Sequence, residues 1–252
     1  MLNPSLVVLY EDSDCLAVAK PAGQFTQGTW APPGETTLET AIRRHLNPAD
    51  PESVYLGIVH RLDRPTSGVL LWAKTSKAAR RLSSQFEKRR VVKEYWAIVA
   101  PGLPRQGFTG EAPLDRVRHR DELEETWSDW LTHPSETGLA QVVAPETRRS
   151  RQAVTLVRRT VSEDLPTGSI WLRLWPETGR THQLRAQAAA RGMPILGDVE
   201  YGSASAFGRP HTIALHARSL QVRHPILQTP MILVAPVPPE WHSFGVPVTS
   251  GG

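Results

Sequence analysis

Asp63 is the residue whose neighbours in the sequence most favour chemistry. It lies between Arg61 and Arg64 in the segment HRLDRPTSGVLLWAK (60–74), just before a turn made of Pro, Thr, Ser and Gly. Two cations beside a carboxylate favour its ionised form, so Asp63 should be charged at neutral pH and able to act as a nucleophile or a base. The apolar run at 69–73 predicts a buried strand that would hold this loop rigidly. The alternative is an aspartate that caps a turn next to surface arginines.

A second segment with chemical potential is PETGRTHQLRAQAAARG (176–192). Its Thr-Gly pair predicts a turn, and Arg180, Thr181 and His182 fall where a helix begins, so backbone N–H groups and the helix dipole favour an anion there. Arg180 and Arg185 are five residues apart and cannot share one helix face, so one could reach a carboxylate while the other binds a phosphate. A capped helix start with surface arginines is the alternative.

The periodicity of the apolar residues predicts the elements that must position these side chains. The first two strands form a hairpin turned by EDSD (11–14), and the first helix begins after an N-cap at Thr37. The helix at 76–89 presents a basic outer surface, made of Lys77, Arg80, Arg81, Lys88 and Arg89. The predicted strands are 6–10, 15–20, 69–73, 91–99, 152–159, 170–175, 213–222 and 231–235, and the predicted helices are 38–46, 76–89 and 183–191. The sum is an α+β fold in which strands dominate.

The middle of the chain carries no recognisable chemistry. The segment 108–147 has too few apolar residues for a core of its own, so we expect an insertion between strands rather than a separate domain. Within it, DELEETWSDWL (121–131) predicts a short acidic helix. The tail, 245–252, is expected to fray.

The composition is that of an ordinary globular protein with a modest positive charge. Of 252 residues 40% are apolar and 21% charged, Lys and Arg outnumber Asp and Glu by 29 to 25, and the pI is about 9.5. Basic residues cluster at 77–93 and 148–159, and acids at 115–149, so the basic faces suggest a polyanionic partner, with a solvated surface as the alternative. The single cysteine, Cys15, excludes a disulfide framework and a thiolate metal site. The start does not look like a signal peptide and no apolar stretch approaches the roughly 20 residues that span a bilayer, so we expect a cytoplasmic protein.

Five segments, in fixed order, resemble the motifs of the RluA-type pseudouridine synthases. They are HRLDRPTSGVLLWAK, KEYWAIV, PETGRTHQLR, GMPILGDVEYG and LHARSLQVRHP. The resemblance covers nearly the whole chain, from KPAG (20–23) to Pro236. It implies an enzyme that isomerises uridine to pseudouridine within ribosomal or transfer RNA, by breaking the bond from ribose to the ring nitrogen and rejoining the base through carbon.

The same resemblance implies the architecture and the partners. It implies the pseudouridine synthase fold, a mixed and mostly antiparallel sheet with a central RNA-binding cleft and flanking helices. It also implies chemistry without a cofactor or a metal. We expect a single catalytic domain over 1–252 that acts as a monomer and lacks a separate N-terminal RNA-binding module.

Residue by residue, the resemblance implies Asp63 as the catalytic carboxylate, Tyr95 against the target base, and Arg180 paired with Asp63. Arg61 is implied to help push the target out of its stack. A uridine inside RNA must leave its stack before any side chain can reach its glycosidic bond, and an aromatic side chain can then stack on the freed base. The side chains expected to bind RNA are His60, Arg61, Arg64, Thr66, Arg80, Arg81, His182 and Arg185.

The chain departs from the family pattern at Ala186 and Gln187, where valine and then histidine are usual. We expect the change to be tolerated, because these positions lie on the helix beyond the arginines. One alternative function is an RNA-binding protein that uses this fold to remodel RNA with little catalysis. A carboxylate hydrolase would need a second acid paired with Asp63, and the motifs contain none. Transfer RNA and large-subunit ribosomal RNA are both open as substrates, because substrate choice depends on loop shape rather than on the motifs.

Overall fold

The computed structural model describes residues 6–28, 31–32, 34–100, 124–134, 138–160, 165, 168–244 and 246. Its contacts divide the chain into two compact units. Unit 1 consists of 1–93, 217–237 and 250–252, and unit 2 of 94–216 and 238–249. None of the described helices combines the length and the apolar character that spanning a bilayer requires.

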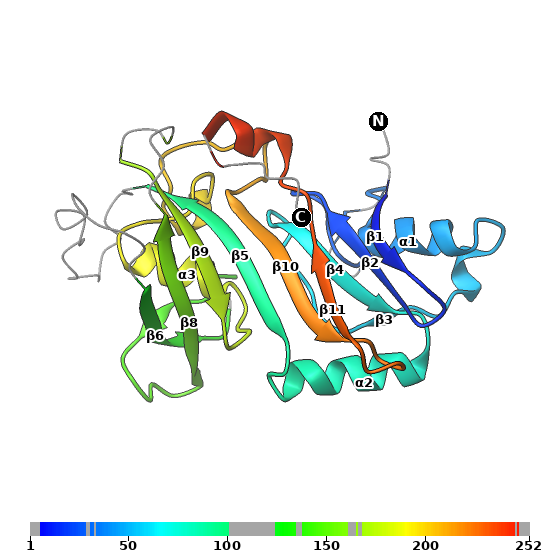
Figure 1. Ribbon diagram of the computed structural model, residues 1–252. Coiled ribbons are helices and arrows are strands. Elements are labelled where there is room, and N and C mark those ends of the chain that lie inside the picture. Colours follow the sequence, from blue (N-terminus) through cyan, green and yellow to red (C-terminus); the bar gives the residue numbers. More distant parts are fainter. Residues whose placement is uncertain are drawn as a thin grey trace. The chain divides into compact units, whose positions relative to one another are not determined.

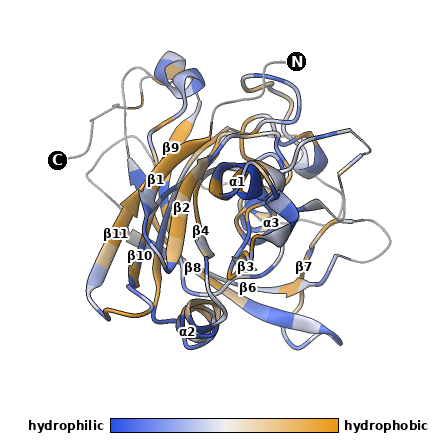
Figure 2. Cartoon of the chain, turned by 90° about the vertical axis from the view of Figure 1, so that its right-hand side faces the viewer, coloured by the Kyte–Doolittle hydropathy of each residue, from blue (hydrophilic) through white to orange (hydrophobic). Residues whose placement is uncertain are grey.

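Unit 1 is built on antiparallel strands (Figure 1). Strand β2 pairs with β1 on one side and with β4 on the other, β3 also pairs with β4, and β10 pairs with β11. Strand β4 is buried along its whole length, and Figure 2 shows the hydrophobic colouring of β2 beside it. The strands are β1 (Val7–Glu11), β2 (Cys15–Lys20), β3 (Gly57–Ile58), β4 (Ser67–Ala73), β10 (Leu215–Arg223, in unit 1 from residue 217) and β11 (Pro230–Val234).

Two α-helices of unit 1 begin at threonine caps. Thr37 accepts a hydrogen bond from the backbone N–H of Thr40 and starts α1 (Leu38–Leu46). Thr75 accepts from the backbone N–H of Ala78 and starts α2 (Ser76–Glu87). Such caps satisfy N–H groups that have no partner inside the helix. A short 3₁₀-helix, η2 (Pro51–Ser53), follows α1.

Unit 2 is a second antiparallel arrangement, in the order β5-β9-β8-β6-β7. Helix α3 packs against β6, where Leu131, Ala153, Ala186 and Tyr201 form a buried cluster. The elements are β5 (Val92–Val99, in unit 2 from residue 94), β6 (Glu124–Thr132), β7 (Val142–Val143), β8 (Ser150–Thr160), β9 (Ile170–Pro176), α3 (Gln183–Ala190), η4 (Val199–Tyr201) and η5 (Pro239–Phe244).

The predicted α+β fold is confirmed, and the predicted strands and helices outside the middle segment match within a few residues. The predicted acidic helix at 121–131 is wrong, because residues 124–132 form strand β6, paired along its length with β8. Its buried residues Trp127 and Leu131 are four apart, a spacing that one face of a helix and one face of a strand share. Residues 108–123 and 135–137 of the predicted insertion lie outside the described residues, as does the predicted frayed tail apart from Val246.

Candidate active site

Asp63 lies in the loop between β3 and β4 of unit 1, and the end of this loop is a tight turn. The backbone N–H of Thr66 donates to the carbonyl of Asp63 at 3.1 Å. Gly68 has φ of +124°, and a Cβ atom there would lie 2.3 Å from the carbonyl oxygen of Ala217. Only glycine allows this backbone conformation together with such a close approach of the neighbouring chain. The turn after the aspartate is therefore fixed by backbone packing.

A buried lysine stabilises the Asp63 loop through hydrogen bonds to its backbone. Lys20 pairs with Gly68 in the β2–β4 register and is 1% exposed. Its ammonium donates to the carbonyls of Pro21, Arg64 and Thr66, at 3.0, 3.0 and 2.7 Å. Burial lowers the pKa of Lys20 to about 7, although the charge of Asp63 acts in the opposite direction. Lys20 therefore positions the backbone on both sides of the turn, a role that the sequence left unassigned.

Further hydrogen bonds join the Asp63 loop to the segment after Lys20. Gly23 donates its backbone N–H to the carbonyl of Arg64 at 2.8 Å, and the Nε of Arg64 donates to the carbonyl of Gly23 at 3.0 Å. Thr26 donates its hydroxyl to the carbonyl of Leu62 at 2.9 Å. The Arg64 guanidinium also pairs with Glu35 at 3.2 Å. Arg64 is thus tied into the loop support, and its predicted contact with RNA stays a prediction.

The other residues predicted to bind RNA in this loop differ in exposure. Arg61 is exposed, as a side chain that reaches a substrate must be. Thr66 is 2% exposed, and its enclosed hydroxyl has no hydrogen-bond partner in the described structure. Burial of this hydroxyl does not favour the predicted contact between Thr66 and RNA.

His60 joins the loop to helix α2. Its Nε2 accepts the backbone N–H of Leu71 at 3.0 Å, and its ring stacks on Phe86 with centroids 4.7 Å apart. Burial, with a smaller contribution from the charge of Lys93, lowers the pKa of His60 to about 3. The ring is therefore a neutral packing group, and its predicted contact with RNA stays a prediction.

This neutral histidine should make the protein sensitive to mild acid. The unfolded chain protonates His60 below a pH of about 6.5, whereas the folded protein keeps it neutral down to about 3. Between these values the unfolded state binds one proton more, so the free energy of unfolding falls as the pH falls, by up to about 1.4 kcal/mol per pH unit. His60→Gln, which keeps an acceptor for Leu71, should show a shallower pH dependence in urea denaturation than the wild type. The exposed His242→Gln is the control for loss of a histidine. Parallel curves for His60→Gln and the wild type would contradict this assignment.

Strand β5 carries the predicted aromatic residue. Tyr95 is partly buried and pairs with Leu174 of β9. The strand is anchored next to it, because Glu94 accepts hydrogen bonds from the Nε1 of Trp96 and from the Nε of Arg173, both at 2.8 Å. Alternation along the strand places Tyr95 on the face opposite to these two anchored neighbours. Tyr95 is thus held by a rigid element while its own ring lies apart from the Glu94 cluster.

The turn at Arg180 is organised by a glutamine. Gln183 accepts the backbone N–H of Arg180 at 3.0 Å and the hydroxyl of Thr178 at 2.7 Å, and it donates to the carbonyl of Val154 at 3.1 Å. The Nε of Arg180 donates to the carbonyl of Gln152 at 3.1 Å. Gln183 therefore fixes the backbone that carries Arg180, which the sequence did not predict.

Helix α3 does not begin at a side-chain cap, which was part of the alternative interpretation of this segment. His182 is the N-cap residue, in the left-handed conformation with φ of 53°, and its side chain does not cap the helix. Its Nδ1 instead lies 3.1 Å from the hydroxyl of Tyr201. This contact gives His182 a packing role, and its predicted binding to RNA stays a prediction.

Arg185 is enclosed within unit 2. The side chain is 3% exposed, contacts Asp198 at 2.7 and 2.8 Å and Glu200 at 2.6 Å, and lies over the ring of Tyr201. The two carboxylates already occupy the hydrogen-bond donors of the guanidinium that a phosphate would need. Burial also keeps the guanidinium away from solvent, where RNA would bind. These contacts do not favour the expectation that Arg185 binds RNA. The sequence could not show that Asp198 would face it.

Gln187, one of the two departures from the family pattern, is more than a tolerated change. It is fully buried, accepts the hydroxyl of Thr155 at 2.7 Å and donates to Asp129 at 2.7 Å. Weaker hydrogen bonds reach the carbonyls of Trp127 and Ala153, both at 3.3 Å. The glutamine therefore ties α3 to β6 and β8.

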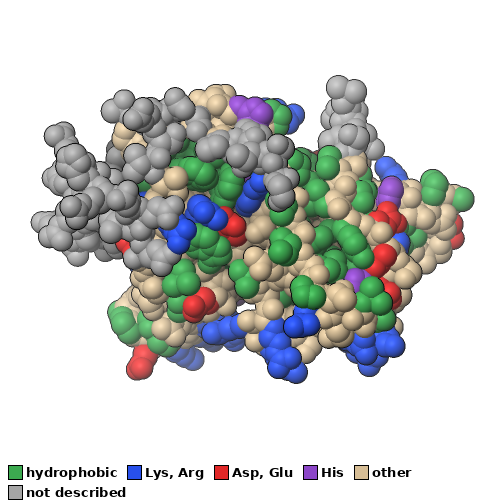
Figure 3. Space-filling view, in the orientation of Figure 1, with side chains coloured by type: hydrophobic (Ala, Val, Ile, Leu, Met, Phe, Trp, Pro, Cys, Tyr) green, Lys and Arg blue, Asp and Glu red, His purple; other side chains and the backbone are tan. Residues whose placement is uncertain are grey.

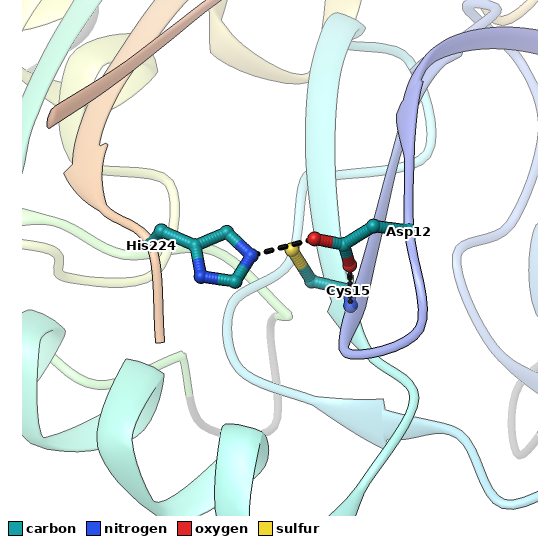
Figure 4. A group of neighbouring side chains, drawn as sticks. All are labelled: Asp12, Cys15 and His224. Carbon is teal, nitrogen blue, oxygen red and sulfur yellow. Dashed lines mark hydrogen bonds and ion pairs between the residues drawn. The ribbon is translucent and has the colours of Figure 1, made fainter. Parts of the chain in front are cut away.

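One group of potential metal ligands occurs among the described residues, made of Asp12, Cys15 and His224 (Figure 4). The Nδ1 of His224 accepts the backbone N–H groups of Ile226 and Leu227, so Nε2 carries the proton and donates to Asp12 at 2.6 Å. Burial acts to raise the pKa of Asp12, but hydrogen bonds from the backbone N–H groups of Cys15 and residue 14 and from His224 lower it well below its usual value. Burial raises the pKa of the Cys15 thiol to about 12, which disfavours the thiolate that binds metals. The group therefore acts as a packing contact between the β1–β2 and β10–β11 turns.

The structure places the three residues predicted to act on substrate in both units. Asp63 belongs to unit 1, whereas Tyr95 and Arg180 belong to unit 2. The predicted pairing of Arg180 with Asp63, which belong to different units, stays a prediction. Each of the three lies on a backbone fixed by buried hydrogen bonds or by strand pairing, as a catalytic group requires.

Comparison with known proteins identifies the family. The model of the RNA pseudouridylate synthase family matches residues 14–190. The tRNA pseudouridine synthase C of Haemophilus ducreyi is 32% identical, over 94% of this chain and 93% of that protein. The dual-specificity RNA pseudouridine synthase RluA of Yersinia pestis is 34% identical, over 90% and 96%.

Solved structures agree on the fold. Human RNA pseudouridylate synthase domain containing 1 superposes with a TM-score of 0.67 and 26% identity, over 92% of this chain and 84% of that one. Human RNA pseudouridylate synthase domain containing 4 superposes with a TM-score of 0.66 and 22% identity, over 94% and 92%. The chain belongs to the RNA pseudouridylate synthase family, as an RluA-type enzyme that isomerises uridine to pseudouridine in RNA.

Proposed function

We propose that this enzyme modifies a uridine in transfer RNA, with Asp63 as its catalytic carboxylate. Support for transfer RNA comes from relatives named tRNA pseudouridine synthase C, which align over about 94% of this chain. Ribosomal RNA stays the second candidate, because another relative is named a dual-specificity RNA pseudouridine synthase, a name that does not restrict the substrate to transfer RNA. The observation that carries the role of Asp63 is its loop, which a buried lysine and a buried strand fix in place.

The chemistry that we propose needs no external reactant. The target uridine leaves its stack, the bond from ribose to the ring nitrogen breaks, and the uracil turns and rejoins the ribose through carbon. The hydrogen lost from that carbon is balanced by a proton gained at the ring nitrogen, so the reaction is an isomerisation. Asp63 supplies the carboxylate at the glycosidic bond, and Arg61, which is exposed, contacts the RNA as the target is extruded.

We propose that Arg180 pairs with Asp63 in the enzyme–RNA complex. The fixed turn at Thr178 and Gln183 supports this role, because it limits the positions that the guanidinium can reach. An adjacent cation would keep the carboxylate ionised when RNA excludes water from it.

Tyr95 should act by stacking on the freed base. Tyr95→Phe keeps the aromatic face, so we expect RNA affinity close to that of the wild type, whereas Tyr95→Leu should weaken capture of the target by about 1–3 kcal/mol. Equilibrium binding and single-turnover pseudouridine formation on one RNA separate the two effects. If Tyr95→Phe is as inactive as a variant without the Asp63 carboxylate, the hydroxyl takes part in proton transfer. Equal activity of wild type, Phe and Leu variants would exclude Tyr95 from the site.

Incubation of the purified protein with separate pools of unmodified transfer RNA and ribosomal RNA tests the substrate. Pseudouridine is then mapped by its chemical reactivity, and a new site in transfer RNA alone is the expected result. Product only in ribosomal RNA would overturn the proposed substrate. Binding without product in either pool would favour the RNA-remodelling alternative.

A further inference from the structure

An open groove in unit 1 is lined by residues of helix α2, by Arg90 and by Gln228 of the turn between β10 and β11. Figure 1 shows α2 below the ends of β10 and β11. The groove has a volume of about 670 Å³. Its lining is basic and polar, made of Lys77, Arg80, Arg81, Ser84, Gln85, Arg90 and Gln228. The only acidic residue of α2, Glu87, is not among these lining residues. We call this feature the α2 groove, and Figure 3 shows Lys and Arg side chains gathered along the lower edge of the molecule, where α2 lies in Figure 1.

Hydrogen bonds between α2 and the β10–β11 turn fix the shape of the α2 groove. Gln85 donates to the carbonyl of Arg223 and accepts its backbone N–H, both at 2.9 Å. Arg81 donates to the carbonyl of Pro225 at 2.9 Å. Gln228 donates to the carbonyls of His224 and Pro225, at 3.1 and 2.9 Å. A wall held in this way loses little conformational entropy when a ligand binds.

The donors of the groove are arranged for a polyanion rather than for a single small anion. Lys77, Arg81 and Ser84 follow one another along one side of α2, over roughly 10 Å at 1.5 Å per residue. Guanidinium groups bind phosphate oxygens through two parallel N–H donors, and hydroxyl and amide side chains add neutral donors. A nucleic-acid strand, which has one phosphate per nucleotide, could contact several of these donors along α2.

The same helix is connected to the Asp63 loop. Strand β4 leaves the loop and enters α2 after only two intervening residues, Lys74 and Thr75. His60, three residues before Asp63, stacks on Phe86, which follows the groove residue Gln85. A ligand in the α2 groove is therefore held by the same rigid part of unit 1 that carries the candidate carboxylate.

We propose that the α2 groove binds the ribose-phosphate backbone of the substrate RNA at a distance from the nucleotide that reacts. This inference rests on the proposed function and deepens it by assigning a second RNA contact. It also refines the basic surface expected from the sequence. Arg90 and Ser84 join the binding residues, Arg81 acts partly as a wall contact, and Lys88 is not part of the lining.

Two matched double variants test this proposal. Lys77→Gln with Arg80→Gln removes two charges from the groove, and Arg44→Gln with Lys88→Gln removes two exposed charges outside it. Binding of unmodified transfer RNA is measured over a range of salt concentrations. The groove pair should weaken binding and lower the slope of log affinity against log salt by roughly 1.4–1.8, since each phosphate contact contributes about 0.7–0.9. The control pair should change both quantities much less, and thermal melting checks that both variants fold.

Each other outcome has a definite meaning. Equal losses in the two pairs would show a diffuse electrostatic effect, and unchanged binding in the groove pair would exclude RNA from the groove. Unchanged RNA binding with loss of affinity for polyglutamate would assign the groove to an acidic protein instead. Pseudouridine formation by the wild type on the same RNA is scored separately, so an inactive wild type would overturn the proposed function without deciding the groove.

Discussion

Asp63→Asn should abolish pseudouridine formation, with a loss in single-turnover rate on the order of 10³-fold or more. Asparagine keeps the volume of the side chain and removes the charge and the nucleophilic oxygen that the chemistry needs. The loop should keep its shape, because asparagine has the same size and the hydrogen bonds from Lys20 are made to the backbone carbonyls of Arg64 and Thr66. We therefore expect RNA affinity and the melting temperature to stay close to those of the wild type.

The rate is measured as release of tritium from RNA labelled at the ring carbon that forms the new bond. Asp50→Asn is the matched control, because Asp50 is an exposed carboxylate of the same unit. It should retain the rate of the wild type. An Asp63→Asn protein that turns over at nearly the wild-type rate would remove Asp63 from the reaction.

Arg180→Met should also lower the rate strongly, by unpairing Asp63 once RNA covers the site. Removing one partner of a buried charge pair typically costs about 3–5 kcal/mol, which corresponds to a rate lower by roughly 10²- to 5 × 10³-fold. Arg180→Lys should recover part of the rate, because it restores the charge without the planar guanidinium. The exposed Arg151→Met in the same unit is the control for general loss of charge.

Thermal melting separates this effect from damage to the turn, since the Nε of Arg180 also holds the carbonyl of Gln152. A folded Arg180→Met protein with wild-type activity would contradict the pairing with Asp63.

Local patterns were sufficient for most elements of the fold. Helix α1 was predicted with its observed bounds, because its cap at Thr37 and the spacing of its apolar residues are local features of the sequence. Strand β6 was not, since the spacing of Trp127 and Leu131 suits both helix and strand and only the pairing with β8 decides between them. The middle segment thus shows where partners distant in sequence determine the structure.

In the candidate site, too, local motifs could be predicted from the sequence and contacts with distant residues could not. The motif around Asp63 could be found from the sequence, but the support by Lys20 could not, because its acceptors at Arg64 and Thr66 are 44 and 46 residues away. The environment of Arg185 could not be predicted from the sequence either. Its buried partner Asp198 is on another element, and an arginine paired inside a core looks the same in sequence as one that awaits a phosphate.

The contact between Asp12 and His224 joins residues 212 positions apart in the chain. Strands β10 and β11 belong to the same unit as β1, β2 and β4, yet the ribosome makes them more than 140 residues after β4. During synthesis the Asp63 loop therefore appears early, while the backbone of Ala217 that packs against Gly68 appears near the end.

The order of synthesis thus sets an order of assembly. Unit 2 is an uninterrupted stretch up to residue 216, so most of it is available before unit 1 can close. A nascent chain can bear the complete HRLD motif, with its supports from Lys20 and Thr26, long before Ala217 can pack against Gly68. The backbone contact between Gly68 and Ala217 can therefore form only after the start of β10 has emerged.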